Sequence, residues 1–81
     1  MNIASADFVV APRPDGRWTA ILNCYDSEED DADMVSAAAS GKSRQCAIRK
    51  TRALLAAMGE LGQQMLAHLE VQLAAQEGSL Q

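Results

Sequence analysis

The chain has 81 residues and a formal net charge of −4, which makes it a single small domain. A net acidic chain is a poor non-specific binder of nucleic acid, because basic side chains supply that affinity. Leu, Ile, Val and Phe together account for 16 residues, close to the level of about 20% below which chains tend towards disorder. So small an apolar content predicts that a second copy helps to bury the core.

The N-terminal part predicts a β-hairpin. Residues 1–7 look like a loose leader, and Phe8–Ala11 is a short, apolar, β-rich run. Pro12–Gly16 predicts a turn, because Pro fixes φ and Asp-Gly accepts positive φ. Arg17–Tyr25 predicts the second strand. Its alternation puts two sets on opposite faces, Trp18, Ala20, Leu22 and Cys24 on one and Thr19, Ile21, Asn23 and Tyr25 on the other.

An acidic run follows the hairpin. Its six carboxylates are those of Asp26, Glu28, Glu29, Asp30, Asp31 and Asp33. The simplest interpretation is a solubilising loop. The functional interpretation is a surface that imitates a phosphate backbone and occupies a basic groove of another protein.

Residues 34–39 allow two structures. Ala favours a short helix capped by Ser27, whereas the position after a hairpin favours a third strand. We favour the strand.

The strongest periodic signal runs from Ser43 to Gln76, where large apolar residues recur at helical spacing and predict one amphipathic helix or a pair of them. The hydroxyl of Ser43 can cap this helix by accepting from the amide of Gln45 or Cys46. Gly59 and Gly62 permit a bend or a close helix crossing. The helical region spans 43–77, with Gly78 as the C′ residue and a tail over 78–81.

The predicted fold class is α+β. We expect one domain over 1–81, with a β-hairpin or three-stranded antiparallel sheet in the 8–40 region. This sheet packs on a long C-terminal helix that can bend. The apolar stripe is wider than a thin sheet can cover, so we expect a homodimer. The expected dimer contact is Leu54, Met58, Leu61, Met65 and Leu69.

The start of the helix is basic. Its five basic residues are Lys42, Arg44, Arg49, Lys50 and Arg52. Acidic side chains are favourable at a helix N-terminus and basic ones are not, so we expect these charges to interact with a group outside the helix. The candidates are the acidic run of the same chain, that of a dimer mate, or a phosphate. Residues 40–43 look like the end of a P-loop, but Ser36 stands where that motif needs Gly, so nucleotide binding is not expected.

The segment Ser40–Lys50 resembles the junction between the third strand and the last helix of double-stranded RNA-binding domains. That family has Gly, Lys and Ser followed by basic residues and Ala, and the hairpin before it is also similar in order. The resemblance covers about half the chain. It implies that Lys42 and Arg44 bind RNA phosphates, while Gln45 replaces an expected base. In size and charge the chain also resembles small acidic phage inhibitors such as anti-CRISPR proteins, with no shared motif.

No catalytic, metal or cofactor motif is present. Cys24 and Cys46 are expected to be reduced thiols, because the first eleven residues lack the features of a signal peptide. These thiols and the single histidine, His68, do not supply the four ligands of a structural zinc site. No apolar run is long enough to cross a membrane. We therefore expect no enzyme, no cofactor, no metal and a cytoplasmic location.

The expected function is that of a small intracellular protein-binding module, an inhibitor or adaptor of the phage type. It would act as a homodimer through its acidic run, on a partner with a basic surface. Two alternatives stay open. The first is a nucleic-acid-binding protein that uses the basic helix start, and the second is a structural subunit of a larger assembly.

Overall fold

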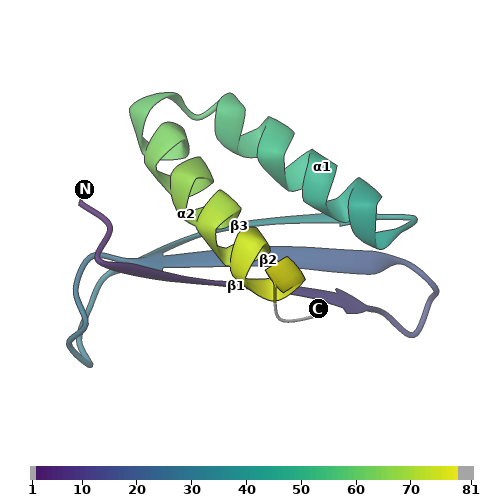
Figure 1. Ribbon diagram of the computed structural model, residues 1–81, viewed down its shortest axis with the longest axis horizontal. Coiled ribbons are helices and arrows are strands. Elements are labelled where there is room, and N and C mark those ends of the chain that lie inside the picture. Colours follow the sequence, from purple (N-terminus) through teal and green to yellow (C-terminus); the bar gives the residue numbers. More distant parts are fainter. Residues whose placement is uncertain (1, 79–81) are drawn as a thin grey trace.

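The computed structural model describes residues 2–78 and shows a three-stranded sheet followed by two helices (Figure 1). The strands are β1 (Ser5–Pro12), β2 (Trp18–Tyr25) and β3 (Met34–Gly41), antiparallel in the order β1-β2-β3. The helices are α1 (Arg44–Ala56) and α2 (Gly59–Gly78), and both cover the same face of the sheet. The predicted α+β fold class is confirmed, and the sheet has three strands.

The first hairpin is longer than predicted. Its register is unbroken from Ser5, opposite Tyr25, to Pro12, opposite Trp18, so residues 5–7 are strand and not part of a leader. The predicted turn is present. Arg13 N donates to Arg17 O at 2.7 Å, and Arg17 N donates to the Asp15 carboxylate at 2.9 Å. The alternation of β2 is also as predicted, because Ala20, Leu22 and Cys24 are fully buried.

The choice of a strand for residues 34–39 is confirmed, and β3 extends it to Gly41. Ala37 lies opposite Leu22 and is 5% exposed. A helix here would have left the other edge of β2 without backbone partners. That requirement outweighs the intrinsic preference of Ala for helix, which amounts to less than about 1 kcal/mol per residue.

The C-terminal region is two helices rather than one long bent helix. Ser43 caps α1 as expected, since its hydroxyl accepts from Cys46 N at 3.1 Å. The chain then reverses at Gly59, whose φ of +69° lies in the left-handed region. At Gly62 a Cβ would overlap the carbonyl oxygen of Leu55 and lie 2.7 Å from the Cβ of Met58. One glycine therefore makes the turn, and the other lets α2 approach α1 closely.

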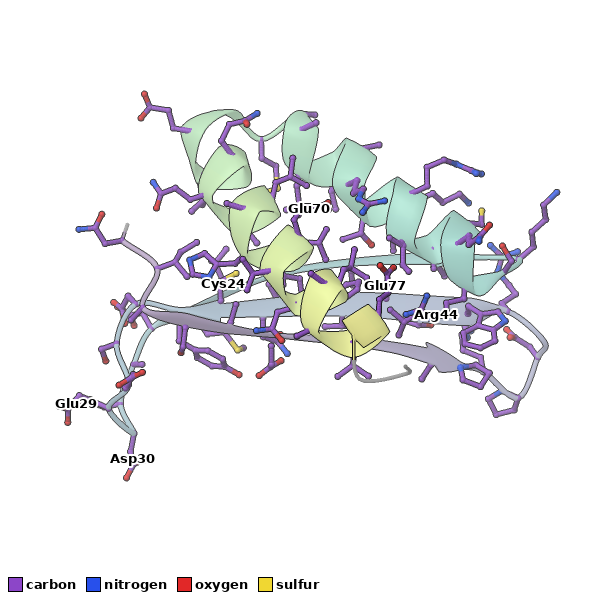
Figure 2. The ribbon with its side chains drawn as sticks, viewed as in Figure 1. Cys24, Glu29, Asp30, Arg44, Glu70 and Glu77 are labelled. Carbon is purple, nitrogen blue, oxygen red and sulfur yellow. The ribbon has the colours of Figure 1, made fainter. Side chains whose placement is uncertain are left out.

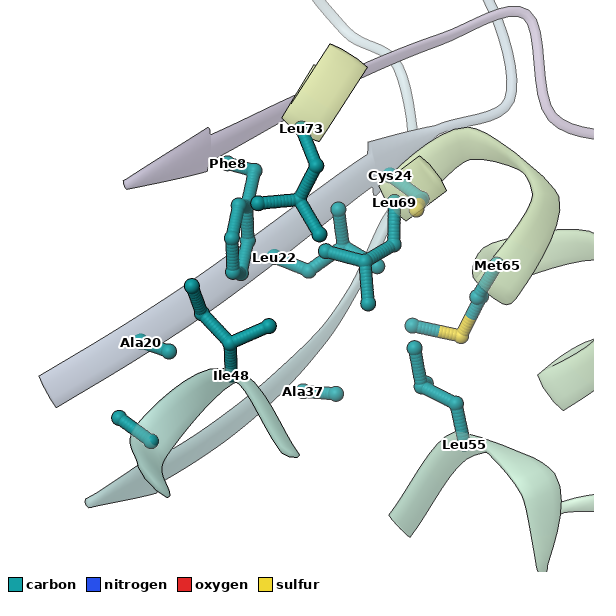
Figure 3. Packing of buried hydrophobic residues seen from close by; sticks show 11 residues of the cluster. Phe8, Ala20, Leu22, Cys24, Ala37, Ile48, Leu55, Met65, Leu69 and Leu73 are labelled. Atoms are coloured by element: carbon teal, nitrogen blue, oxygen red, sulfur yellow. The ribbon is translucent and has the colours of Figure 1, made fainter. Parts of the chain in front are cut away.

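The core lies between the sheet and the helix pair (Figure 3). Helix α1 lies mainly against β3 and β2, and α2 lies against β1. Because the chain folds back at Gly59, Leu55 of α1 and Met65 of α2 meet above the sheet. The buried cluster comprises Phe8, Ala20, Leu22, Cys24, Ala37, Ala47, Ile48, Leu55, Met65, Leu69 and Leu73.

Candidate functional site

The molecule is charge-polarised along its longest dimension, which is 34 Å. The acidic loop, residues 26–33, joins β2 to β3 at one end of the sheet. The turn at 13–17 and the start of α1 lie at the other end, because Pro12, Trp18 and Gly41 are neighbours across the sheet. Eight-residue strands separate the two ends by about 26 Å. Figure 2 shows Glu29 and Asp30 far from Arg44.

The acidic loop has a closed neck and a projecting tip. At the neck, Asp26 N donates to Asp33 O at 3.1 Å, and Asp33 N donates to the Asp26 carboxylate at 2.9 Å. At the tip, Ala32 N donates to Glu29 O at 3.2 Å and closes a tight turn. Glu29 and Asp30 point away from the body of the molecule (Figure 2). These hydrogen bonds therefore fix the loop and leave the carboxylates at its tip exposed.

The acidic loop has no ion pair within the described part of the chain. The two ion pairs among residues 2–78 join Arg13 to Asp15 and Arg52 to Glu70. Neither uses a carboxylate of the loop. The interpretation in which the basic helix start neutralises the acidic run of its own chain is therefore wrong, because the sheet holds the two segments at opposite ends.

The basic helix start divides into two groups. Arg52 faces α2, where its Nε and Nη2 bind the two oxygens of Glu70 at 2.6 and 2.9 Å. This hydrogen-bonded pair raises the pKa of Arg52 and lowers that of Glu70. Lys42, Arg49 and Lys50 are exposed, and Arg44 is half-buried.

The turn between β1 and β2 adds two arginines to this basic end. Arg13 and Arg17 lie at the end of the sheet where α1 begins, because Trp18, just after the turn, lies opposite Gly41, just before α1. Neither arginine belongs to the basic cluster predicted from the sequence. The predicted hairpin followed by a third strand was the signal that could have placed them there.

A shallow pocket of about 190 Å³ lies between the start of α1 and the end of α2. Ile48 and Leu73 supply its apolar lining, and Arg44, Gln45, Arg52 and Glu77 its polar lining. The volume is below the range of about 300–1,000 Å³ typical of small-molecule sites. The pocket therefore favours no particular ligand.

The face of the sheet opposite the helices carries a row of polar residues that was not predicted from the sequence. Asn23 Nδ2 donates to Asp7 Oδ1 at 3.0 Å, and Ser36 Oγ donates to Asn23 Oδ1 at 2.6 Å. The hydroxyl of Tyr25 donates to Asp7 Oδ2 at 3.2 Å, and this bond raises the pKa of Tyr25. Asp7 lies in the segment 1–7, for which the sequence predicts a leader and no site residue.

Both cysteines are free and buried. Burial raises the pKa of Cys24, and the charge of Asp7 adds to the effect. A hydrogen bond with the backbone of Lys42 lowers the pKa of Cys46, although burial acts in the opposite direction. Arg49 Nη2 donates to Cys46 Sγ at 3.6 Å. Part of the basic helix start is thus engaged with its own helix.

The residues expected at a dimer contact are only partly accessible. Met65 and Leu69 are fully buried within one chain, and Leu61 is half-buried against the core. Leu54 and Met58 are 43% and 37% exposed. The contact expected from the apolar stripe is therefore reduced to Leu54 and Met58, because folding into two helices covers the rest.

Neither a metal cluster nor a membrane helix is found in the part of the chain that the structure describes. Among residues 2–78, no three side chains of His, Cys, Asp or Glu are grouped so that they could hold a metal ion. None of the described helices is long and apolar enough to span a membrane.

Comparisons with known proteins return no relative. No protein-family model matches the chain, and neither a curated protein nor a solved structure matches it.

Proposed function

We propose that this chain is a small non-enzymatic binding module that docks a basic surface of another protein through its acidic loop. One observation carries the proposal: six carboxylates are clustered in a loop at one end of the fold, and none has an ion-pair partner among the described residues. Crowding like charges has a cost in self-repulsion, and a basic partner surface would remove that cost. An inhibitor or adaptor of this kind acts by occupying the basic surface of its partner protein.

The geometry of the loop supports this role. The hydrogen bonds at its neck order the backbone before any partner arrives, so less conformational entropy is lost on binding. Clustered charge of one sign also speeds the encounter with a surface of the opposite sign, most strongly at low salt. Binding through this loop should therefore be fast and sensitive to salt.

The test is capture from a cell lysate with matched charge variants. The wild-type chain is expected to retain a basic protein, and Glu29→Gln with Asp30→Asn should reduce its capture. Glu60→Gln with Glu77→Gln removes the same net charge elsewhere and should leave the capture intact. Equal retention by the two double variants, or no retention by wild type at low salt, would contradict the proposal.

Nucleic-acid binding is the second candidate, and one observation favours it. Arg17 lies at the same end of the sheet as Lys42 and Arg44 and widens the basic surface, whereas Arg13 at that end is paired with Asp15. Binding through phosphates would weaken uniformly across sequences in the variant Lys42→Ala with Arg44→Ala. A mobility-shift assay with double-stranded RNA and with DNA tests nucleic-acid binding. The absence of a shift at low salt would exclude this function.

A further inference from the structure

The two edges of the sheet are protected very differently. The outer edge of β1 carries Pro12, and the side chain of Gln76 donates to Phe8 O at 2.7 Å. Proline and a covering helix are two of the means by which proteins block an edge strand. The eight residues of β3 contain neither proline nor charge, and the described chain, residues 2–78, adds no strand beyond β3.

The register shows which backbone groups of β3 point outward. Within an antiparallel strand, the N–H and C=O of one residue point to the same side, and successive residues alternate. Asp26 N donates to Asp33 O in the register that also pairs Leu22 with Ala37, so the odd-numbered residues of β3 face β2. The bond from Gln76 to Phe8 O agrees with this register, because Phe8 lies opposite Leu22 and its backbone N–H and C=O point away from β2. The outward groups of β3 therefore belong to Met34, Ser36, Ala38 and Ser40.

We propose that β3 pairs antiparallel with β3 of a second copy, about a two-fold axis at Ala37 or Ala38, and joins two sheets into one. The strand suits self-pairing, because its uncharged sequence places no like charges opposite each other. Two-fold symmetry also limits the assembly to two copies, because each β3 edge is then covered by the other and neither stays open to a further strand. Both pairs of helices then lie on the same face of the shared sheet.

Charge complementarity supports a second copy as the occupant. Antiparallel pairing brings the N-terminal end of one β3 to the C-terminal end of the other. With either centre, Asp33 lies within one residue of Lys42 of the second copy. The basic helix start, which is unfavourable for its own helix dipole, thus meets the acidic loop of its mate. The tip at Glu29 and Asp30 points away from the body and stays available to another protein.

Helix α1 adds an exposed apolar side chain on the same flank. Arg52 points towards α2, and Leu54 follows two residues later, about 200° further round the helix. Leu54 therefore lies on the flank away from α2, above the side of the sheet that β3 borders. Leu54 is 43% exposed, and pairing of the two β3 edges would bring the second copy next to this exposed side chain.

The experiment is sedimentation of wild type and three single variants, with circular dichroism to check folding. Ala38→Pro removes an outward N–H, and Ala38→Lys places two like charges beside the axis. Wild type should sediment as a dimer, and both variants should be folded monomers whose dissociation constant is raised about tenfold or more. Ala6→Pro removes an outward N–H from the protected edge of β1 and should leave the dimer intact.

Amide exchange, followed by NMR, gives a second measurement that does not depend on mutation. The amides of Ser36 and Ala38 should exchange slowly in wild type and rapidly in the Ala38→Lys variant. A wild-type chain that is monomeric at every concentration would overturn the proposal. So would a dimer in which Ala38→Lys leaves the mass unchanged and the Ser36 and Ala38 amides exchange rapidly.

Discussion

At the scale of single residues, the two glycines between the helices have different tasks. Gly59 supplies a positive φ that a residue with a Cβ adopts at a cost of about 1–2 kcal/mol. Gly62 supplies room, since a Cβ there would meet the backbone of Leu55, which no side-chain rotation can move away. Gly78 meets neither constraint and serves as the control.

We expect Gly62→Ala to lower the free energy of unfolding by about 1–3 kcal/mol, because α2 must shift away from α1. The better helix propensity of Ala, worth about 1 kcal/mol, offsets only part of that loss. Gly59→Ala should cost about 1–2 kcal/mol, and Gly78→Ala should be neutral or slightly stabilising. Urea denaturation measures all three. A Gly62→Ala chain as stable as Gly78→Ala would show that the close helix contact is not required.

The sequence predicted residues whose role is local better than residues whose role depends on the folded chain. The cap at Ser43 was predictable, because its partner, Cys46, is three residues away. The burial of Met65 was not, because helical spacing shows that a face is apolar without showing what covers it. The ion pair of Arg52 was not predictable either, because the turn at Gly59 brings its partner, Glu70, beside it from the second helix.

At the scale of elements, the pair of Arg52 and Glu70 ties α1 to α2. The pKa of Glu70 is lowered in the folded state, so the pair stabilises the fold above the unfolded pKa, about 4.3. That stabilisation is lost as the pH falls through the folded pKa. The two side chains are 47% and 48% exposed, which limits the effect to at most about 1 kcal/mol.

We therefore expect Glu70→Gln to be less stable than wild type at neutral pH and equally stable in acid. Urea denaturation at the two pH values gives the comparison, with Glu28→Gln in the acidic loop as the control. A penalty of the same size in acid would mean that Glu70 acts through packing rather than through its charge.

The hairpin and the helical region followed from the sequence. The type of residues 34–39, the number of helices and the start of β1 did not. The strands alternate in hydrophobicity and the turn contains Pro-Asp-Gly, so the hairpin was predictable. Residues 5–7 were missed because Ser-Ala-Asp has little β propensity, and pairing with Asn23–Tyr25 overrides it. The sequence did not decide whether the helix bends or breaks into two crossing helices at Gly59 and Gly62, because glycine in a helix permits either.

At the scale of the whole molecule, the separation of charge is a consequence of topology. The sequence places the acidic and basic segments only about ten residues apart, which suggests that they neutralise each other. The strand β3 lies between them and carries them to opposite ends of the sheet. Because the candidate site consists of charges held apart, its residues were predictable from composition but their separation was not.

The most direct test of a free acidic loop is the melting temperature of a quadruple variant. Replacing Glu28 and Glu29 with Gln and Asp30 and Asp31 with Asn removes four negative charges and spares the hydrogen bonds at the neck of the loop. Because these carboxylates have no ion-pair partner among the described residues, neutralising them reduces self-repulsion and costs no ion pair. The variant is therefore expected to melt at or above the wild-type temperature. A variant that melts well below wild type would show that the acids stabilise their own chain or its dimer, and would contradict their assignment as a surface for another protein.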